Sequence, residues 1–593
     1  MTAKIWTNNY APVLPFTAQD FPVGALLPMI LYLFRWGHRR GRGRFSTVFA
    51  SEGGGKPTVR SVSHLLALDP RFDGFDSKPG LEVIGDMLLS SVLENRRRSE
   101  SHDEQVQRCF PAHYMASWID LPLHAANLRG VPEAIVAIIA DQPTGETLEA
   151  GRKQGRYPVG ARIQDNELVR SFSQGVEVEG DQRASLRSDH FDESAEIGLD
   201  QLLTVRLAQF CGEAPIKARG KGEASPIPNQ RPIASKATKE FREDLLTFFD
   251  CYGRNQTVPR LSLLPMFESA IAVGLTTILL STIRIVEHWV TEGSILEPLQ
   301  QIPWPVFMDC SGSADPQLRD FSEQSGVLVR QQLSRLSGTL MYMRLLDFYV
   351  RTESDIPRKD LPESAPDATA WLNLLGKVAK GTHEESRDAE RYFRSRCRSL
   401  VDASAAAVSA ELRTDILGNE ADGQRHGTRL AEALTLALEE GAGGDKVLGF
   451  LSAALMTDEP NGLARRRRIT VKRPGVGGRK TADVASFVLT NTVLEYLVHR
   501  HLRRSGKGRK SQSLSLPSFL KILRERYGFH IDQSPPNMIV PNELLQRNRR
   551  VVERRLRDLG LLVGVNDAER MKKLRARYTA AYDTDTSEVI VSD

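Results

Sequence analysis

Three polar side chains in the middle of the chain have types and spacing that could hold a metal ion. In the segment PVFMDCSGSADP, Asp309, Ser311 and Ser313 follow one another at intervals of two residues. A carboxylate and two hydroxyl groups offer hard oxygen ligands of the kind that Mg²⁺ and Ca²⁺ prefer. The same residue types also form polar turns, because their side chains accept hydrogen bonds from nearby backbone N–H groups. The pattern therefore leaves two hypotheses, a metal loop and a structural turn.

The D-x-S-x-S pattern resembles the first metal loop of von Willebrand A-type domains. This resemblance implies a long apolar strand before the loop, and a Thr and an Asp from later loops. Here the apolar run before Asp309 is only Val306–Met308, and a helix-rich segment follows. We therefore favour the turn, with Asp315 capping a helix that begins at Pro316. We predict no metal and no cofactor.

A second group of metal-capable side chains lies in SDHFDES. Its spacing matches no ligand template, so solvated side chains are the favoured interpretation. A metal-dependent nuclease that uses either group stays open as an alternative, although no ordered set of catalytic residues supports an enzyme. The second group comprises Asp189, His190, Asp192 and Glu193.

The charge distribution indicates a polyanion-binding module. Residues 461–580 contain 28 Lys and Arg against 9 Asp and Glu, a net charge of +19. Residues 1–460 carry a net charge of −10, and the tail at 581–593 carries −4. Such asymmetry is typical of a nucleic-acid-binding part joined to a body of another kind.

Cysteine usage and hydropathy favour a cytoplasmic protein. The five cysteines lie far apart and form no C-x-x-C pair, and the chain shows no signal peptide, as expected of a reducing compartment. The apolar runs Val23–Phe34 and Ala270–Ile283 are shorter than the roughly 20 residues of a spanning helix, so we predict buried helices and no membrane contact.

One segment near the C-terminus has two opposite faces. In PNELLQRNRRVVERRLRDLGLLVG (541–564), apolar side chains recur at helical spacing, and Arg547, Arg550, Arg554 and Arg557 fall on the other side. Gly560 ends the helix and a short strand follows. Whether Asn548 caps a separate recognition helix, or one helix runs throughout, stays open. Exposed helices usually interleave acids, so a row of arginines favours phosphate contacts.

The elements before this segment are also basic. LARRRRITVKRPGVGGRK is a basic loop or hairpin, and a helix is expected over Asp483–Arg504. A hinge follows, and then a helix capped by Ser515, with Pro517 in its first turn. The order of helices, arginine helix and strand resembles a winged helix-turn-helix. The predicted nucleic-acid contacts are Arg465, Arg466, Arg467, Arg468, Lys507, Arg509, Lys510, Arg547, Arg549, Arg550, Arg554 and Arg557.

The N-terminal part contains a second arginine-rich stretch, FRWGHRRGRGRFS (34–46). Its arginines could follow phosphates while Phe34, Trp36 and Phe45 stack on bases, or it could be an exposed basic loop. The exposed basic loop is the favoured interpretation.

The fold class is predominantly α with minor β (α+β), with several domains. A helical body precedes the winged-helix-like module, because strong helix formers with glycine stops fill its second half. The expected parts are a mainly helical domain at 1–141, a mixed α/β segment with a linker at 142–239, a helical domain at 240–460, the basic module at 461–580 and an acidic tail at 581–593.

Two stretches, SFVLTNTVLEYLVHRHLRR and LLQRNRRVVERRLRDLGLLVGVNDAERMKKLRARY, resemble a protein of bacterial methylation-associated anti-phage defence systems. IGLDQLLTVRLAQ adds to this resemblance. This resemblance implies a cytoplasmic DNA-associated component that works beside a methyltransferase and nuclease-type partners. It assigns no catalytic residue to this chain. We expect a non-catalytic subunit that binds duplex DNA and docks partners through its acidic body. The alternatives are the nuclease and an RNA-binding or scaffold protein.

Overall fold

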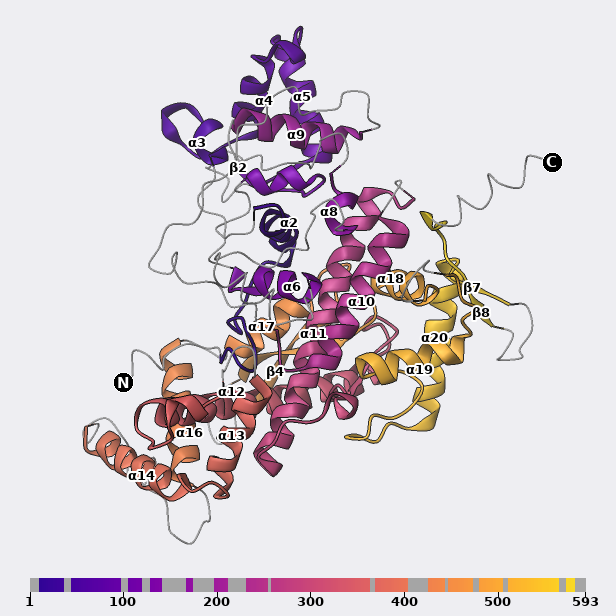
Figure 1. Cartoon of the computed structure of the whole chain (residues 1–593). Helices are drawn as coiled ribbons and strands as arrows, with labels where there is room; N and C mark the ends of the chain where they lie inside the picture. The colour runs from indigo at the N-terminus through magenta and orange to yellow at the C-terminus, as the bar shows by residue number, and fades with distance from the viewer. Residues whose placement is uncertain are drawn as a thin grey trace, which may run out of the picture. The chain divides into compact units, whose positions relative to one another are not determined.

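The chain forms a predominantly helical protein with short strands, which confirms the predicted fold class. The structure is a computed structural model (Figure 1). It describes residues 10–36, 44–96, 105–119, 128–140, 167–173, 197–211, 231–253, 257–362, 368–403, 425–442, 446–472, 479–504, 510–564 and 572–581.

The described residues divide into two compact units. The first contains residues 1–21, 230–244 and 266–577, and the second contains residues 22–229, 245–265 and 578–593. The basic module, which we define as residues 461–580, therefore belongs to the first unit almost entirely.

The second unit is built from short helices around an apolar core. Its two strands, β1 (Leu93–Arg96) and β2 (Gln105–Cys109), pair antiparallel. Phe45, Leu66 and Leu207 lie in the core together with the strands. Its helices are α2 (Leu26–Trp36), α3 (Phe45–Val48), α4 (Val59–Ala67), α5 (Lys78–Ser91), α6 (Val131–Ala140), α8 (Glu167–Ser171) and α9 (Leu199–Cys211).

The first unit contains the longest helices that the structure describes. α11 is long and apolar enough to cross a membrane by composition, but 83% of its most apolar window is buried, as in the core helix of a globular protein. This burial agrees with the expectation for Ala270–Ile283. Two helices are shared with the second unit: α10 (Ser235–Tyr252), which belongs to the first unit up to residue 244, and α11 (Arg260–Glu292), which belongs to it from residue 266. The others are α12 (Pro316–Thr352), α13 (Ala368–Lys380), α14 (Ser386–Ala403), α16 (His426–Ala442), α17 (Lys446–Ala454), α18 (Asn491–His501), α19 (Leu516–Tyr527) and α20 (Asn542–Asp558).

Helix α12 begins where the sequence predicts. Asp315 is its N-cap and accepts hydrogen bonds from the N–H groups of Gln317 and Leu318, with Pro316 in the first turn. The helix packs against strand β5 (Arg479–Phe487), and a Cβ atom at Gly326 would lie 2.6 Å from the carbonyl oxygen of Ala485. Glycine at this position permits the close contact between helix and strand.

The described residues of this unit form three strand pairs, of which β3–β6 joins parts that are distant in the sequence. β3 (Val306–Phe307) runs parallel to β6 (Phe529–His530), and Asp309 continues the pairing with Val488. β4 (Ala464–Lys472) and β5 form a long antiparallel ladder, and β7 (Leu562–Val563) pairs with β8 (Lys573–Leu574). The basic segment at 464–472 is therefore a hairpin strand, which was one of the two expected forms.

The helix expected over Asp483–Arg504 is shorter than predicted. It begins at Asn491, and Asp483–Phe487 belongs to strand β5 instead. The prediction was wrong here because the apolar residues fit a helical period locally, whereas the ladder with β4 pairs every residue of this segment across the hairpin.

The basic module ends in a compact arrangement of three helices and a small sheet. The order is α18, a short extended segment at Leu514–Ser515, α19, α20, β7 and β8, and Figure 1 shows α19, α20 and the β7–β8 pair gathered at the yellow end of the chain. Ser515 pairs antiparallel with Lys573, and the N–H of Leu574 donates to the carbonyl of Leu514. α19 has the predicted Ser515 cap and ends at Gly528 in a left-handed conformation.

Candidate nucleic-acid interface

The D-x-S-x-S segment forms a tight polar turn beneath α20. Asp309 is fully buried, and one of its carboxylate oxygens accepts hydrogen bonds from the N–H and hydroxyl of Ser311, at 2.7 and 2.6 Å. Its other oxygen accepts from the N–H of Ser313 at 2.9 Å. Burial raises the pKa of Asp309, and these hydrogen bonds oppose that shift. The turn predicted from the sequence is confirmed, because both oxygens are engaged within the segment itself.

Within the described ranges, no three His, Cys, Asp or Glu side chains gather where they could hold a metal ion. The other candidate group, Asp189, His190, Asp192 and Glu193, lies outside the described residues. The nuclease alternative thus gains no support from the geometry of Asp309.

Helix α20 is a single continuous helix, which answers the question left open by the sequence. It runs from Asn542 to Asp558, and Gly560 follows in a left-handed conformation with φ 71°. Its inner face buries Leu544, Leu545, Val552 and Leu556. The first two pack in one apolar cluster with Phe307 of β3 and Leu318 of α12. The helix is therefore packed against β3 and α12 of the first unit, which we call the body.

Asn548 fixes α20 by hydrogen bonds to three backbone groups. Its side-chain oxygen accepts from the N–H of Cys310 at 2.9 Å, and its amide nitrogen donates to the carbonyls of Met308 at 2.8 Å and Ile531 at 3.1 Å. Asn548 is fully buried. A buried amide with all these partners satisfied orients the helix about its own axis, because rotation would break several bonds at once.

Arg555 is the inward-facing arginine of α20. Its guanidinium group donates to the carbonyl of Cys310 at 2.8 Å, to the carbonyl of Leu489 at 2.5 Å and to the side chain of Asn491. Sequence reasoning missed Arg555 and gave Asn548 a different role. A signal for both roles was present in the sequence, since Asn548 and Arg555 lie four residues before and three residues after the apolar residue Val552. They therefore share its buried face of the helix, where a polar side chain needs a hydrogen-bond partner.

The outer face of α20 carries the predicted row of arginines. Arg547, Arg550, Arg554 and Arg557 are all exposed, and the Arg554 side chain has an exposed fraction of 85%. Arg547 pairs with Asp315 at 3.2 Å, Arg554 lies 3.8 Å from Asp558, and Arg557 donates to Glu553 at 2.6 Å. We call Arg550, Arg554 and Arg557 the arginine face, because Arg547 is held by the body. Arg549 is half-buried beside this face.

The four arginines of β4 bind acceptors within the chain. Arg467 makes two hydrogen bonds to the carboxylate of Glu323 on α12, at 2.9 and 2.6 Å. The Arg465 guanidinium group donates to the carbonyl of Asp458 at 2.6 Å, and that of Arg466 donates to the hydroxyl of Ser452 at 3.0 Å. The backbone N–H of Arg466 donates to the Asp458 carboxylate at 2.8 Å, and Arg468 lies 3.4 Å from Asp483. Arg466, Arg467 and Arg468 are nonetheless exposed. These contacts give the hairpin a structural role that the sequence did not indicate.

The remaining predicted contacts are only partly described. Lys510 is exposed, whereas Lys507 and Arg509 lie outside the described residues. Most of the arginines of the 34–46 stretch also lie outside them. Phe34 and Phe45 are fully buried, so the hypothesis that they stack on bases is wrong: their rings fill apolar core.

A buried ionic cluster joins the basic module to α10. Asp244 lies 2.7 Å from the guanidinium groups of both Arg500 of α18 and Arg526 of α19, and it accepts a hydrogen bond from the Tyr527 hydroxyl at 2.7 Å. Burial pushes the pKa of Asp244 upward, but the two arginines outweigh it and hold that pKa below its ordinary value. His501 bonds to the same tyrosine at 2.8 Å, and burial lowers its pKa to about 3.

The fold and the site together define a helical protein with a basic α/β module whose last helix presents arginines outward. The model of one family, methylation-associated defense system protein MAD7, matches residues 10–578. The chain therefore belongs to this family, and it is a protein of methylation-associated defence systems, as the resemblance in the sequence implied. A search of the curated proteins and a search of the solved structures found no match.

Proposed function

We propose that this protein is a non-catalytic component of its defence system that binds duplex DNA through the arginine face of α20. The observation that carries the proposal is the combination of three exposed guanidinium groups on one side of a helix with apolar and hydrogen-bonded anchoring on the other. At about 1.5 Å per residue, Arg550 and Arg557 lie roughly 10 Å apart along the helix. This row can follow successive phosphates, which supplies affinity and position more than sequence specificity.

The arrangement around α20 supports a winged helix-turn-helix interpretation. In that fold, the third helix enters the major groove and a β-hairpin lies beside it. Here α18, α19 and α20 occur in that order, the segment at Leu514–Ser515 adds a strand to β8, and β7 follows α20 directly. We assign α20 the role of the groove-binding helix, since Arg550, Arg554 and Arg557 on its outer face are exposed.

A charge-matched pair of triple variants tests the proposal. The test variant replaces Arg550, Arg554 and Arg557 with glutamine. The control replaces Arg387, Arg391 and Arg398, three exposed arginines on one face of α14, so both variants lose the same charge. Fluorescence anisotropy with a labelled duplex is measured over a salt series.

We expect the test variant to lower the salt slope by about 2.7, since each lost phosphate contact accounts for about 0.9. Its affinity at low salt should fall by at least about tenfold, because each charge-assisted hydrogen bond contributes 1.5–3 kcal/mol, while the control binds like the parent. Equal losses in both variants would mean that only overall charge matters, and no loss in the test variant would refute the assignment. Tighter binding to RNA or single-stranded DNA of equal length would favour the RNA-binding alternative.

The acidic body supports a second role, the docking of partner proteins. Residues 1–460 carry a net charge of −10, opposite in sign to the module. Membership of a multi-component defence system suggests other defence proteins as partners, and we propose the methyltransferase or a nuclease of the same system, acting in the cytoplasm. Co-purification of a tagged chain with each of these proteins, expressed together, tests this part.

A further inference from the structure

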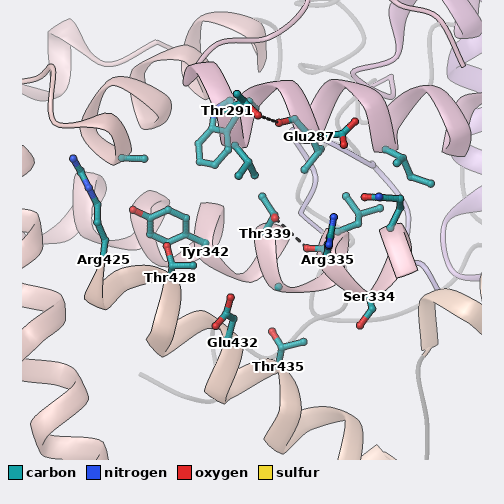
Figure 2. Close-up of a pocket in the computed structure, with 18 of the residues that line it drawn as sticks. Glu287, Thr291, Ser334, Arg335, Thr339, Tyr342, Arg425, Thr428, Glu432 and Thr435 are labelled. Atoms are coloured by element: carbon teal, nitrogen blue, oxygen red, sulfur yellow. Dashed lines mark hydrogen bonds between the residues drawn. The ribbon is translucent and has the colours of Figure 1, made fainter. Parts of the chain in front are cut away.

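A pocket in the helical body lies apart from the arginine face of α20. Its volume is about 890 Å³, which is within the usual range of small-molecule sites. Helices α11, α12 and α16 form its walls and floor, and the end of α13 closes one side (Figure 2). All the lining residues belong to the first unit.

One end of the pocket offers hydrogen-bond donors. Figure 2 shows Tyr342, Arg425 and Thr428 on the same side of the cavity. The ring of Tyr342 is held edge-on by Trp289 and Phe393, with centroids 6.3 and 6.4 Å away. Burial raises the pKa of Tyr342 to about 12, so its hydroxyl is protonated at neutral pH and can donate. Its hydroxyl makes no hydrogen bond to any residue that the structure describes.

Arg425 lies on the same side of the pocket as this hydroxyl, and among the described residues its guanidinium group has one hydrogen-bond acceptor (Figure 2). Its guanidinium group donates to the carbonyl of Val378 at 3.4 Å, a long bond that uses one of five N–H groups. A Cβ atom at Gly381 would lie 2.7 Å from the same guanidinium group, so glycine at this position leaves room for the arginine side chain. Lys380 and Arg335 add two further positive charges to the lining.

The rest of the pocket mixes polar and apolar side chains. Its apolar lining includes Leu336 of α12, Val290 of α11 and Leu436 of α16, and the last two are exposed by 48% and 53%. Gly338 leaves room above the α12 backbone, because a Cβ atom there would have only the Glu432 side chain within 4 Å, at 4.0 Å. Two glutamates of the lining, Glu287 and Glu432, disfavour ligands of high negative charge.

We propose that this pocket binds a small organic anion, whose acidic group lies between Arg425 and the Tyr342 hydroxyl and whose apolar body covers Leu336, Val290 and Leu436. A single carboxylate, sulfonate or phosphate head fits this end, since a guanidinium group and a phenol are both donors to an oxyanion. The glutamates on the walls limit the ligand to a low charge.

Two fluorescent dyes that differ in one group test the proposal on the full chain. Anilinonaphthalene sulfonate is an aromatic anion, and N-phenylnaphthylamine has the same rings without the sulfonate. Each dye is titrated against the parent, Arg425→Gln, Arg425→Lys, Tyr342→Phe and the control Arg391→Gln, which lies on the exposed face of α14. Thermal unfolding of each variant establishes that it folds.

We expect the anionic dye to bind the parent at least about tenfold more tightly than the neutral dye, as one charge-assisted hydrogen bond provides. Arg425→Gln should remove this difference, Tyr342→Phe should reduce it about fivefold, and Arg425→Lys and the control should retain it. Equal affinity of the two dyes for the parent, or unchanged binding of the anionic dye to Arg425→Gln, would overturn the proposal. Adenosine monophosphate and octanoate then compete with the dye: displacement by one identifies a phosphate or carboxylate ligand, and displacement by neither also overturns the proposal.

Discussion

Replacing Asn548 with alanine should loosen α20 from the body. The substitution removes three hydrogen bonds and leaves the carbonyls of Met308 and Ile531 and the N–H of Cys310 without this partner. All three residues are buried. Because leaving one buried polar group unpaired costs roughly 1–3 kcal/mol, we expect the free energy of unfolding to fall by about 4 kcal/mol.

Urea denaturation gives this free energy, and hydrogen exchange at the Cys310 amide gives a local readout, because its N–H donates to the Asn548 side chain. The matched control is Asn542→Ala, an exposed asparagine in the first turn of the same helix. Protection at Cys310 should fall only in Asn548→Ala. A loss of stability below about 1 kcal/mol, together with unchanged exchange at Cys310, would refute the view that this side chain orients the arginine helix.

Two further predictions concern packing and pH. Gly326→Ala should lower the free energy of unfolding, measured by urea denaturation, by about 1–3 kcal/mol, since its Cβ atom would lie 2.6 Å from the Ala485 carbonyl oxygen. Gly338→Ala in the same helix should raise it by up to about 1 kcal/mol, because the space beside Gly338 is open and alanine favours a helix. Burial lowers the pKa of His499 to about 4 and that of His501 to about 3, so the unfolded chain binds more protons than the folded chain below pH 6.5. The free energy of unfolding should therefore keep its full value above this pH and fall on acidification. The loss at pH 5 should be on the order of 2 kcal/mol per histidine.

Each of these two predictions has a clear contrary result. If the two glycine variants shift the urea midpoint equally and in the same direction, the close contact of Gly326 with strand β5 does not explain the change in stability. For the pH prediction, urea denaturation at pH 7 and pH 5 is compared between the parent and His499→Asn. The control is His64→Gln, which replaces an exposed histidine. A pH dependence that stays unchanged in His499→Asn would contradict the role given to its buried imidazole.

The sequence predicted those features that depend on neighbouring residues. The two faces of α20 follow from helical periodicity, and the caps at Asp315 and Ser515 follow from residue types that accept hydrogen bonds from the next turn. The turn at Asp309 belongs to the same class. In each case the partners lie within one or two turns of the chain, so their geometry is fixed locally.

Features that depend on distant partners could not be predicted. Arg467 is indistinguishable in sequence from a phosphate-binding arginine, and only the fold brings Glu323 to it across 144 residues. The same holds for Asp483–Phe487, whose strand conformation comes from its ladder with β4. Net charge does not separate guanidinium groups that face solvent from those that pair with a carboxylate, as Arg467 does with Glu323.

The buried cluster at Asp244 also has a consequence for synthesis of the protein on the ribosome. Asp244 is made 282 residues before its partner Arg526. At roughly 5–20 residues per second, this delay is on the order of 15–60 s. During that time the carboxylate of Asp244 on α10 lacks its Arg526 partner, so the first unit cannot reach its final packing until the C-terminal helices emerge. A nascent chain released early should thus be a target for chaperones and proteases, which would limit the defence component in the cell to complete copies.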